Sequence, residues 1–197
     1  MNQEQIWNNI APKWNKLKTK PFTPAVKFLK NKKGNILDLG CGSGRNFVKI
    51  NGIIYGLDFS KNMIKYAKEN TEKKKIKVKL KQMKNNKISF KDDFFDAAIC
   101  IALLHCMKKT EQKKILKELY RVMKSNSKTL ISVWSKNHRV LKNKPKECFV
   151  NWNSDGKVLP RYTYTYNKKE LEQQLKKTGF RILKSKEDEN IIVIVEK

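Results

Sequence analysis

The sequence predicts a single α/β domain whose mostly parallel β-sheet is covered by helices on both faces. Two observations support this fold class. Short apolar runs typical of buried strands alternate with segments whose apolar residues recur at helical spacing, and such alternation is typical of a parallel sheet. Near the C-terminus, two apolar runs are separated only by the polar residues 184–190, which predicts an antiparallel pair there.

The expected strands follow the apolar runs in chain order. They are residues 36–39, 53–57, 76–80, 95–102, 129–134, 180–183 and 191–195. Runs this short suit strands better than helices, which usually need about ten residues or more. The first five should be parallel, and the last two should form the antiparallel hairpin.

Helical segments separate most of these strands. Apolar residues recur at helical spacing over 6–17, although Pro12 is expected to break or restart that helix. A short helix is expected over 24–30, and another should begin near Arg45. Gly179 is expected to stop the last helix. Three helices have predicted N-caps, whose side chains accept hydrogen bonds from free backbone N–H groups: Ser60, Thr110 and Asn167.

No boundary between domains is visible, so residues 1–197 are expected to form one domain. Residues 1–32 should form an N-terminal helical cap. Residues 136–166 should form an insertion on the side of the sheet where a substrate enters. Within it, the polar stretch 137–160 is expected to be irregular.

The composition excludes several protein classes. The longest apolar run, residues 97–104, is far shorter than the ~20 residues that a membrane-spanning helix needs. The polar residues 1–4 do not resemble a signal peptide. The four cysteines show no Cys-x-x-Cys pair, so no zinc or other metal site is expected. These features predict a reduced, cytoplasmic protein without a membrane partner.

The chain is strongly basic, with a net charge of +27 from 45 basic and 18 acidic residues. Such an excess attracts phosphate backbones and favours a nucleic-acid partner. A second interpretation stays open, because nearly all of the basic residues are lysine and A/T-rich codons encode lysine. Arginine, which makes shaped contacts with carboxylates and phosphates, is rare in the chain.

A glycine-rich loop follows the first expected strand. The apolar run that ends in Asp38 is followed by Gly40, Gly42 and Gly44. Backbone without side chains lets a ligand approach closely, and free N–H groups at the start of a helix favour an anion. The loop therefore predicts a nucleotide-like ligand. A nicotinamide-binding loop would have its third glycine one position later, where Arg45 stands.

The second expected strand ends in Asp58, whose carboxylate can accept hydrogen bonds from both hydroxyls of a ribose. Asp38, the Gly-x-Gly-x-Gly spacing, Asp58 and the antiparallel hairpin together resemble class I S-adenosylmethionine-dependent methyltransferases. The resemblance implies a seven-stranded Rossmann-like sheet and S-adenosyl-L-methionine as cofactor. It also implies a set of cofactor-binding residues, namely Trp14, Asp38, Gly40, Cys41, Gly42, Gly44, Asp58, Phe59, Met83 and Ala102.

One region departs from that family. Its members usually carry an acid after the third strand, near the adenine, whereas this chain has Gln82-Met83-Lys84-Asn85 there. Adenine contacts are then expected from backbone groups, from Gln82 or from Met83. Two interpretations of Asp38 stay open, direct contact with the ligand and support of the glycine loop.

Three further segments resemble the tRNA wobble-uridine carboxymethyl methyltransferases, which convert the carboxylate of 5-carboxymethyluridine in the anticodon to a methyl ester. They are Ile10-Ala11-Pro12-Lys13-Trp14 continuing to Phe22, Ile99-Cys100-Ile101-Ala102-Leu103-Leu104-His105, and Arg161-Tyr162-Thr163-Tyr164-Thr165-Tyr166. The chain also departs from this family, which commonly has an arginine at Lys18 and histidines at Cys106 and Tyr164.

This resemblance implies roles around the acceptor. His105 would lie beside it, Arg161 would hold the substrate carboxylate or a nearby phosphate, and Tyr162 would belong to the same catalytic group. The implied substrate-binding residues are Lys18, Lys20, Arg45 and Tyr164. A carboxylate, with an ordinary pKa of about 4, is already ionised at neutral pH, so the reaction needs no base. His105 could instead be a structural residue, and Arg161 could lie on a strand with one packed face.

The resemblance also implies partners. The tRNA anticodon stem-loop would be the substrate, and a small zinc-binding activator protein would pair with residues 76–80 at an edge of the sheet. Two rival functions stay open. One is a small-molecule methyltransferase that acts on a quinone or another metabolite. The other is a non-catalytic RNA-binding protein that keeps the methyltransferase fold.

Overall fold

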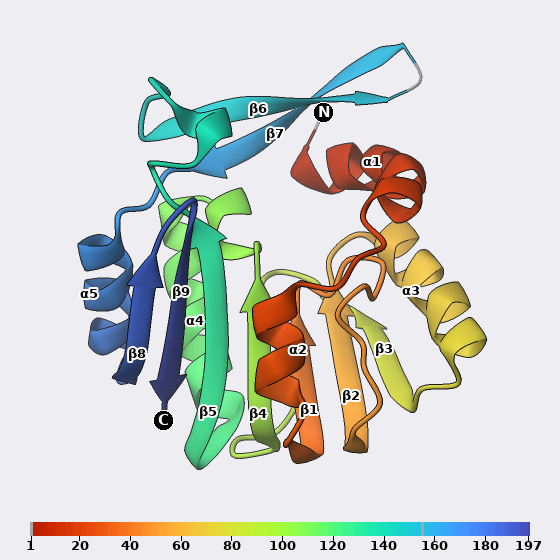
Figure 1. Cartoon of the computed structure of the whole chain (residues 1–197), viewed down its shortest axis with the longest axis vertical. Helices are drawn as coiled ribbons and strands as arrows, with labels where there is room; N and C mark the ends of the chain where they lie inside the picture. The colour runs from red at the N-terminus through yellow and green to blue at the C-terminus, as the bar shows by residue number, and fades with distance from the viewer. Residues whose placement is uncertain (1, 155) are drawn as a thin grey trace.

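A seven-stranded sheet forms the centre of the molecule, in the order β3-β2-β1-β4-β5-β9-β8 (Figure 1). The computed structural model describes residues 2–154 and 156–197. Neighbours from β3 to β5 are parallel, whereas β9 is antiparallel to both β5 and β8. The strands are β1 (Lys33–Leu39), β2 (Asn51–Asp58), β3 (Val78–Gln82), β4 (Phe95–Ile101), β5 (Met123–Trp134), β8 (Arg181–Glu187) and β9 (Asn190–Glu196). The predicted fold class is confirmed.

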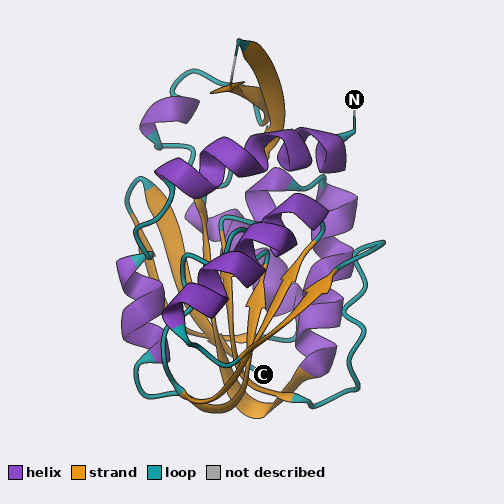
Figure 2. Ribbon diagram, turned by 90° about the vertical axis from the view of Figure 1, so that its right-hand side faces the viewer, coloured by secondary structure: helices purple, strands orange, loops and turns teal. Residues whose placement is uncertain are grey.

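Helices cover both faces of this sheet (Figure 2). They are α1 (Gln3–Leu17), α2 (Thr23–Leu29), α3 (Lys61–Lys74), α4 (Lys109–Val122) and α5 (Lys168–Thr178). Successive side chains of a strand point to opposite faces, so β1 contributes to two cores. Ile36 belongs to the core under α2 and α3, together with Leu29. Leu37 belongs to the core under α4 and α5, together with Leu116 and Leu171.

Local capping residues mark two helix starts and one helix end where the sequence predicts them. The Ser60 hydroxyl accepts a hydrogen bond from the Met63 backbone N–H at the start of α3, O to N 3.1 Å. Asn167 does the same for Glu170 at the start of α5, at 2.9 Å. Gly179 ends α5 with a φ of 110°, a conformation that favours glycine.

Helix α4 does not start where the sequence predicts. Its N-cap is Lys108 and its first residue is Lys109, so Thr110 lies inside the first turn. The carboxylate of Glu111 accepts the N–H of Lys108 at 2.9 Å. This bond satisfies a backbone donor at the helix start without a capping side chain at Thr110.

Helix α1 continues through Pro12, where the sequence predicts a break. Proline has no N–H to donate to the carbonyl four residues earlier, which belongs to Asn8. That carbonyl accepts instead from the side-chain amide of Asn62 in α3, O to N 3.0 Å. The contact between α1 and α3 therefore supplies the hydrogen bond that the helix lacks.

The chain after the glycine loop forms turns rather than the helix predicted near Arg45. All three loop glycines have positive φ, between 55° and 76°, which interrupts helical geometry. Tight bonds from the Gly44 N–H to the Cys41 carbonyl and from the Phe47 N–H to the Gly44 carbonyl, 3.0 and 3.2 Å, replace helical ones.

Much of the stretch predicted to be irregular forms a separate antiparallel hairpin. Strands β6 (Glu147–Ser154) and β7 (Lys157–Tyr164) pair along their whole lengths. Burial alternates along β6, whose even-numbered residues lie on the covered side. This period of two is the sequence signal for a strand in that stretch. Together with α1, the hairpin lies above the carboxyl ends of the parallel strands (Figure 1).

Neither a membrane span nor a metal cluster is present in residues 2–154 and 156–197. None of the helices in these ranges is long and apolar enough to cross a membrane. The same residues hold no cluster of three or more histidine, cysteine, aspartate or glutamate side chains that could bind a metal ion.

Candidate functional site

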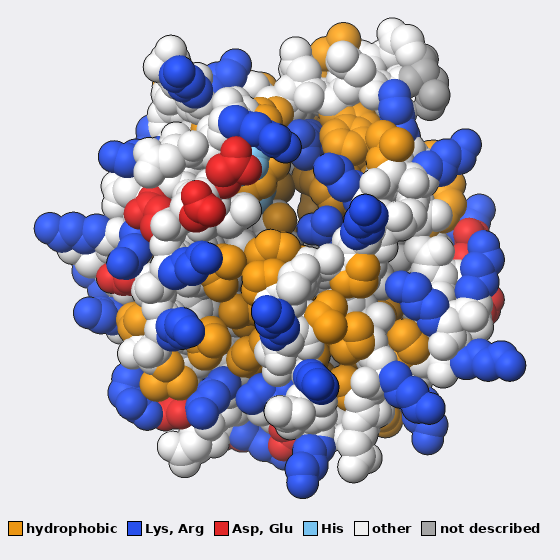
Figure 3. Space-filling view, in the orientation of Figure 1, with side chains coloured by type: hydrophobic (Ala, Val, Ile, Leu, Met, Phe, Trp, Pro, Cys, Tyr) orange, Lys and Arg blue, Asp and Glu red, His pale blue; other side chains and the backbone are white. Residues whose placement is uncertain are grey.

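A hollow lies where β1, β2 and β4 end beneath α1 and the hairpin, at the point where the sheet order reverses from β1 to β4. In open α/β sheets, ligands bind at this point. The hollow, called here the inner cavity, contains about 560 Å³ of space, including space open to solvent, and Figure 3 shows it with hydrophobic walls and basic side chains at its rim. It is lined by Trp7, Trp14, Gly40, Cys41, Gly42, Arg45, Asn46, Asp58, Phe59, Met63, Ile101, Ala102, Leu103 and Cys106.

The glycine loop forms one wall of the inner cavity. Gly42 has a φ of 55°, and a Cβ placed there would lie 3.7 Å from Nε1 of Trp14. A Cβ on Gly40 would lie 2.9 Å from Cβ of Leu103, which is too close. Glycine at these positions therefore brings bare backbone to the cavity surface.

Asp58 joins the end of β2 to this loop. One carboxylate oxygen accepts from the Gly42 N–H at 2.9 Å, and the other accepts from the Ser60 N–H at 2.9 Å. Burial raises the pKa of Asp58 to about 6, while these backbone donors act in the opposite direction. Each oxygen keeps a second lone pair, so the carboxylate can still accept from a ligand.

Asp38 is a buried carboxylate without a hydrogen bond from any described residue. It is 1% exposed, and neither side-chain oxygen has a partner. Burial raises its pKa to about 7, the negative charge of Asp58 adds to this, and the Arg45 guanidinium opposes it. An ionised carboxylate in this buried position costs free energy unless a cation or hydrogen-bond donors contact it. Asp38, which the sequence predicts as a cofactor-binding residue, is not among the residues that line the inner cavity.

Aromatic rings of α1 and the hairpin roof the inner cavity. The Trp14 ring centroid lies 5.4 Å from those of both Trp7 and Trp152. The Arg45 guanidinium carbon lies 5.9 Å from the Trp14 centroid. These contacts join the N-terminal helix, the hairpin and the glycine loop around the inner cavity.

Arg161 of β7 is a buried cation in an aromatic box. Its guanidinium carbon lies 5.7, 5.6 and 5.2 Å from the ring centroids of Trp7, Trp134 and Trp152. Its Nε is buried with no hydrogen-bond partner among the described residues, and burial lowers its pKa. Trp7 belongs to both the box and the inner cavity, so Arg161 lies directly behind the cavity wall.

His105 lies in the short 3-10 turn η1 (Leu104–Cys106) after β4. Its Nδ1 accepts the Trp134 backbone N–H at 3.1 Å, and the two rings stack with centroids 4.8 Å apart. Burial, assisted by the charge of Arg161, lowers the pKa of His105 to about 3. The ring is therefore neutral at physiological pH, and with Nδ1 accepting, Nε2 carries the proton and can donate.

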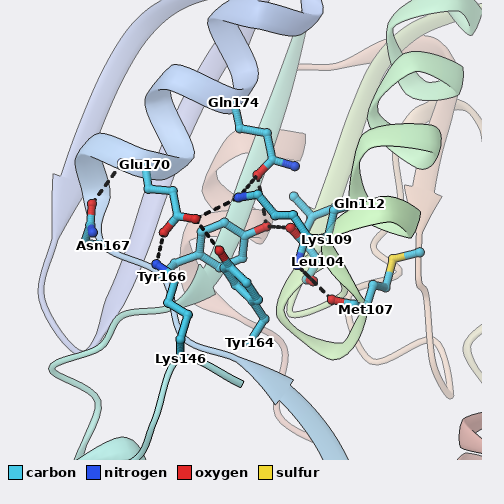
Figure 4. A network of polar contacts seen from close by, with 10 residues as sticks. All are labelled: Leu104, Met107, Lys109, Gln112, Lys146, Tyr164, Tyr166, Asn167, Glu170 and Gln174. Atoms are coloured by element: carbon cyan, nitrogen blue, oxygen red, sulfur yellow. Dashed lines mark hydrogen bonds and ion pairs between the residues drawn. The ribbon is translucent and has the colours of Figure 1, made fainter. Parts of the chain in front are cut away.

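A polar network holds the turn that carries His105 (Figure 4). The Gln112 amide donates to the carbonyls of Leu104 and Met107, at 3.1 and 2.8 Å. Its own oxygen accepts from the Tyr166 hydroxyl at 2.5 Å. The network thus fixes η1 against α4 and the chain that follows β7.

The two tyrosines predicted near the acceptor lie away from the inner cavity. Because strand residues alternate, Tyr162 points to the opposite face of β7 from Arg161 and packs against Phe149, with centroids 6.1 Å apart. The Tyr164 hydroxyl donates to Glu170 (Figure 4). Tyr162 lines a groove next to the inner cavity rather than the cavity itself.

Most residues predicted to bind a cofactor line the inner cavity: Trp14, Gly40, Cys41, Gly42, Asp58, Phe59 and Ala102. Met83 lines the adjacent groove, and Gly44 shapes the loop, since a Cβ there would lie 2.6 Å from the Phe47 ring. Of the residues predicted to bind a substrate, Arg45 lines the cavity, whereas Lys18 and Lys20 are exposed.

Several lining residues were not predicted, namely Trp7, Asn46, Met63, Ile101, Leu103 and Cys106. For Trp7 a signal exists, because it lies seven positions before Trp14 and so on the same helix face. Asn46 lies in a turn whose path depends on the tertiary fold, and its side chain accepts the Phe22 N–H at 2.9 Å.

Comparison with protein families gives one match over most of the chain. A family model described as a methyltransferase domain matches residues 30–187. Among curated proteins, Probable tRNA methyltransferase 9B of Mus musculus is 26% identical over 75% of this chain and 33% of its own length. The tRNA (carboxymethyluridine(34)-5-O)-methyltransferase ALKBH8 of Macaca fascicularis is 28% identical over 90% of this chain and 26% of its own length. The chain therefore spans a third or less of these two relatives.

The chain is also similar to a quinone methyltransferase and to solved methyltransferase structures. The 2-phytyl-1,4-naphtoquinone methyltransferase of Trichormus variabilis is 29% identical over 81% of this chain and 65% of its own length. Among solved structures, a SAM-dependent methyltransferase from Methanosarcina mazei has a TM-score of 0.72 and 21% identity, covering 90% of this chain and 98% of that one. A Haloferax volcanii methyltransferase in complex with the Trm112 activator has a TM-score of 0.74 and 13% identity, covering 98% and 95%.

Proposed function

The chain belongs to the methyltransferase-domain family, with S-adenosyl-L-methionine as cofactor, and from this premise we propose that it methylates the carboxylate of 5-carboxymethyluridine at the tRNA wobble position. The observation that supports a carboxylate as the methyl acceptor is Arg161, whose buried guanidinium has an unpaired Nε and lies behind the cavity wall. A buried cation of this shape suits a carboxylate.

The residues around the inner cavity fit the cofactor. Bound S-adenosyl-L-methionine supplies a methyl group on a positively charged sulfur. Asp58 would accept from the ribose hydroxyls with its remaining lone pairs. Asp38, buried with no protein donor, would face a cationic part of the cofactor, and the backbone of Gly40 and Gly42 permits close approach.

Two residues would act on the acceptor. Arg161 would pair with the substrate carboxylate, and His105 would donate a hydrogen bond to it from Nε2. Neither needs to remove a proton, because the carboxylate is ionised at neutral pH. This fits the lowered pKa of His105, about 3, which makes it a poor base. Trp7 and Trp14 would keep water out, and reaction between opposite charges is favoured in such a site.

The chain would work in the cytoplasm as one domain, with residues 1–32 as a cap and 136–166 on the substrate side. Its net charge of +27 suits a tRNA anticodon stem-loop, and the exposed Lys18 and Lys20 are available to its phosphates. Strand β3 is an edge of the sheet, as the activator contact near 76–80 requires. The complex of a similar methyltransferase with Trm112 supports that partner.

A methyl-transfer assay tests the proposal. With labelled cofactor, tRNA that carries 5-carboxymethyluridine is expected to gain a methyl group that mild alkali removes, because an ester hydrolyses. The same tRNA without the carboxymethyl group is the matched control, and each reaction is run with and without the activator. A methyl group that resists alkali, or equal labelling of the control tRNA, contradicts the proposed acceptor.

A small-molecule acceptor is the second candidate. The 29% identity to a naphthoquinone methyltransferase and the hydrophobic lining of the inner cavity favour it. A quinone acceptor would be labelled without any dependence on salt concentration. The non-catalytic RNA-binding alternative predicts cofactor and RNA binding with no labelled product.

Cofactor affinity should depend on pH. The cofactor is cationic at its sulfur, so it should bind the ionised forms of Asp38 and Asp58, whose pKa values are about 7 and about 6. Affinity is therefore expected to rise with pH between about 5 and 8, with proton release on binding. Calorimetry in two buffers of different ionisation enthalpy measures both quantities. Asp38→Asn should flatten the upper part of the profile, and a flat wild-type profile contradicts the assignment.

His105→Ala is expected to lower turnover on tRNA by about 100-fold, because the lost donor would position the acceptor carboxylate and a misplacement of about 1 Å can cost that much. Cofactor affinity should stay within about twofold. His138→Ala is a matched control, because His138 stacks on the same Trp134 ring with centroids 4.4 Å apart. Equal losses in the two variants would mean that the histidines only support Trp134.

A further inference from the structure

A second hollow adjoins the inner cavity on the far side of the hairpin. It contains about 2250 Å³ of space, including space open to solvent, and shares Phe59, Leu103 and Cys106 with the inner cavity. Its other walls are the start of α1, the loop after β3, the start of α4 and the hairpin. The part beyond the shared residues is called here the outer groove, and it is defined by Lys61, Lys84, Lys108, Lys114, Phe149 and Tyr162.

The outer groove is basic. Its four lysines are exposed, and none forms an ion pair with a described residue. The groove also holds two acids, Glu4 and Glu111, which accept hydrogen bonds from neutral amides and keep their charge, so the four lysines leave the groove with a net positive charge. Four ammonium groups that are not engaged in ion pairs with described residues suit the phosphates of a bound nucleic acid.

The outer groove also offers an aromatic platform. Phe149 is 56% exposed, because its neighbours Cys148 and Val150 fill the covered face of β6 and alternation turns Phe149 outward. Tyr162 stands opposite it in register, with the rings edge to face. An exposed ring beside such lysines is the arrangement that binds unpaired bases through stacking and phosphates through charge.

We propose that the outer groove binds the single-stranded RNA that flanks the target nucleotide, with a base stacked on Phe149 and phosphates on the four lysines. The inference rests on the proposed function, since it assumes an RNA substrate, and adds a second subsite to it. It assigns recognition of unpaired RNA to the hairpin face opposite Arg161. Base-paired RNA hides its base faces and does not fit the platform.

Binding of a fluorescein-labelled single-stranded ten-nucleotide oligouridylate to the full chain tests the stacking contact. Fluorescence anisotropy is expected to show about tenfold weaker binding for Phe149→Ala than for wild type. Val158→Ala is the matched control, because Val158 is 60% exposed on the same face of the hairpin and does not line the groove. Thermal unfolding should be unchanged for both variants. Equal binding by wild type and Phe149→Ala overturns the inference.

Salt dependence tests the lysines. The log–log slope of binding against salt should become less steep by about 0.7 for each phosphate that the variant no longer binds, in both Lys108→Ala and Lys114→Ala. Lys184→Ala, at an exposed position of β8, should keep the wild-type slope. A polyglutamate peptide that competes as well as the oligonucleotide would overturn the inference, because the groove would then recognise charge alone.

The two proposals fail separately. Methyl transfer to tRNA that proceeds equally in wild type and Phe149→Ala overturns the outer-groove inference and leaves the proposed function intact. Oligonucleotide binding that depends on Phe149, without methyl transfer to tRNA, overturns the proposed acceptor and supports the groove as an RNA site.

Discussion

Replacing Arg161 by methionine is expected to lower methyl transfer to tRNA by about 10²- to 10⁴-fold, while cofactor affinity stays within about twofold. Losing one member of a buried charge pair costs about 3–5 kcal/mol, and each 1.36 kcal/mol corresponds to about tenfold in rate. The charge pair in question joins Arg161 to the substrate carboxylate. It forms only in the complex with substrate, because the Arg161 Nε has no partner among the described residues. Single-turnover kinetics and calorimetry measure the two effects.

The same variant should remain folded. Methionine has a similar length, packs well against aromatic rings and removes the cost of burying a cation between Trp7, Trp134 and Trp152. Its unfolding temperature is therefore expected to match that of the wild type. Arg161→Lys keeps the charge without the planar fork, and should recover part of the activity. A variant that unfolds at much lower temperature would show that Arg161 is structural.

Asp58→Ala is expected to weaken cofactor binding by at least about 100-fold, because hydrogen bonds to a charged acceptor contribute about 1.5–3 kcal/mol each. The variant should also be less stable, since the N–H groups of Gly42 and Ser60 lose their acceptor. Calorimetry with S-adenosyl-L-methionine measures the first effect, and thermal unfolding the second.

Ser60→Ala separates these two effects. It removes the cap of α3 at a cost of about 1 kcal/mol, but keeps the Asp58 carboxylate and both of its backbone donors. We expect reduced stability with nearly unchanged cofactor affinity. If Ser60→Ala weakened cofactor binding as much as Asp58→Ala, the ribose role of Asp58 would be wrong.

Much of the fold and part of the candidate site were predictable from local patterns. Apolar runs and capping residues such as Ser60 and Asn167 report on neighbours in the chain, so they locate strands and helix starts. Asp38, Asp58 and the glycines lie where strands end, and parallel strands bring their carboxyl ends to one edge. The sequence therefore predicts the glycine loop and Asp58 at the same edge of the sheet.

The remaining features depend on contacts between distant segments. Pro12 stays helical because Asn62 of another helix satisfies the carbonyl of Asn8, and no local rule contains that partner. The spacing of Tyr164 from Arg161 in the sequence does not show that Tyr164 lies away from the acceptor site. Its position depends on a hydrogen bond to Glu170 in α5.

The sequence by itself determined the α/β class, the alternation of strands and helices along the chain and the carboxylates at the strand ends, because periodicity and glycine spacing are local properties. Only the tertiary structure decided the protonation and pairing of the site. Arg161 becomes a buried, unpaired cation because Trp7, Trp134 and Trp152 come from three separate elements. His105 is neutral because it is buried beside Arg161, and the Trp134 N–H of β5, bound to Nδ1, leaves the proton on Nε2. Burial and charge depend on distances between segments, and folding alone sets those distances.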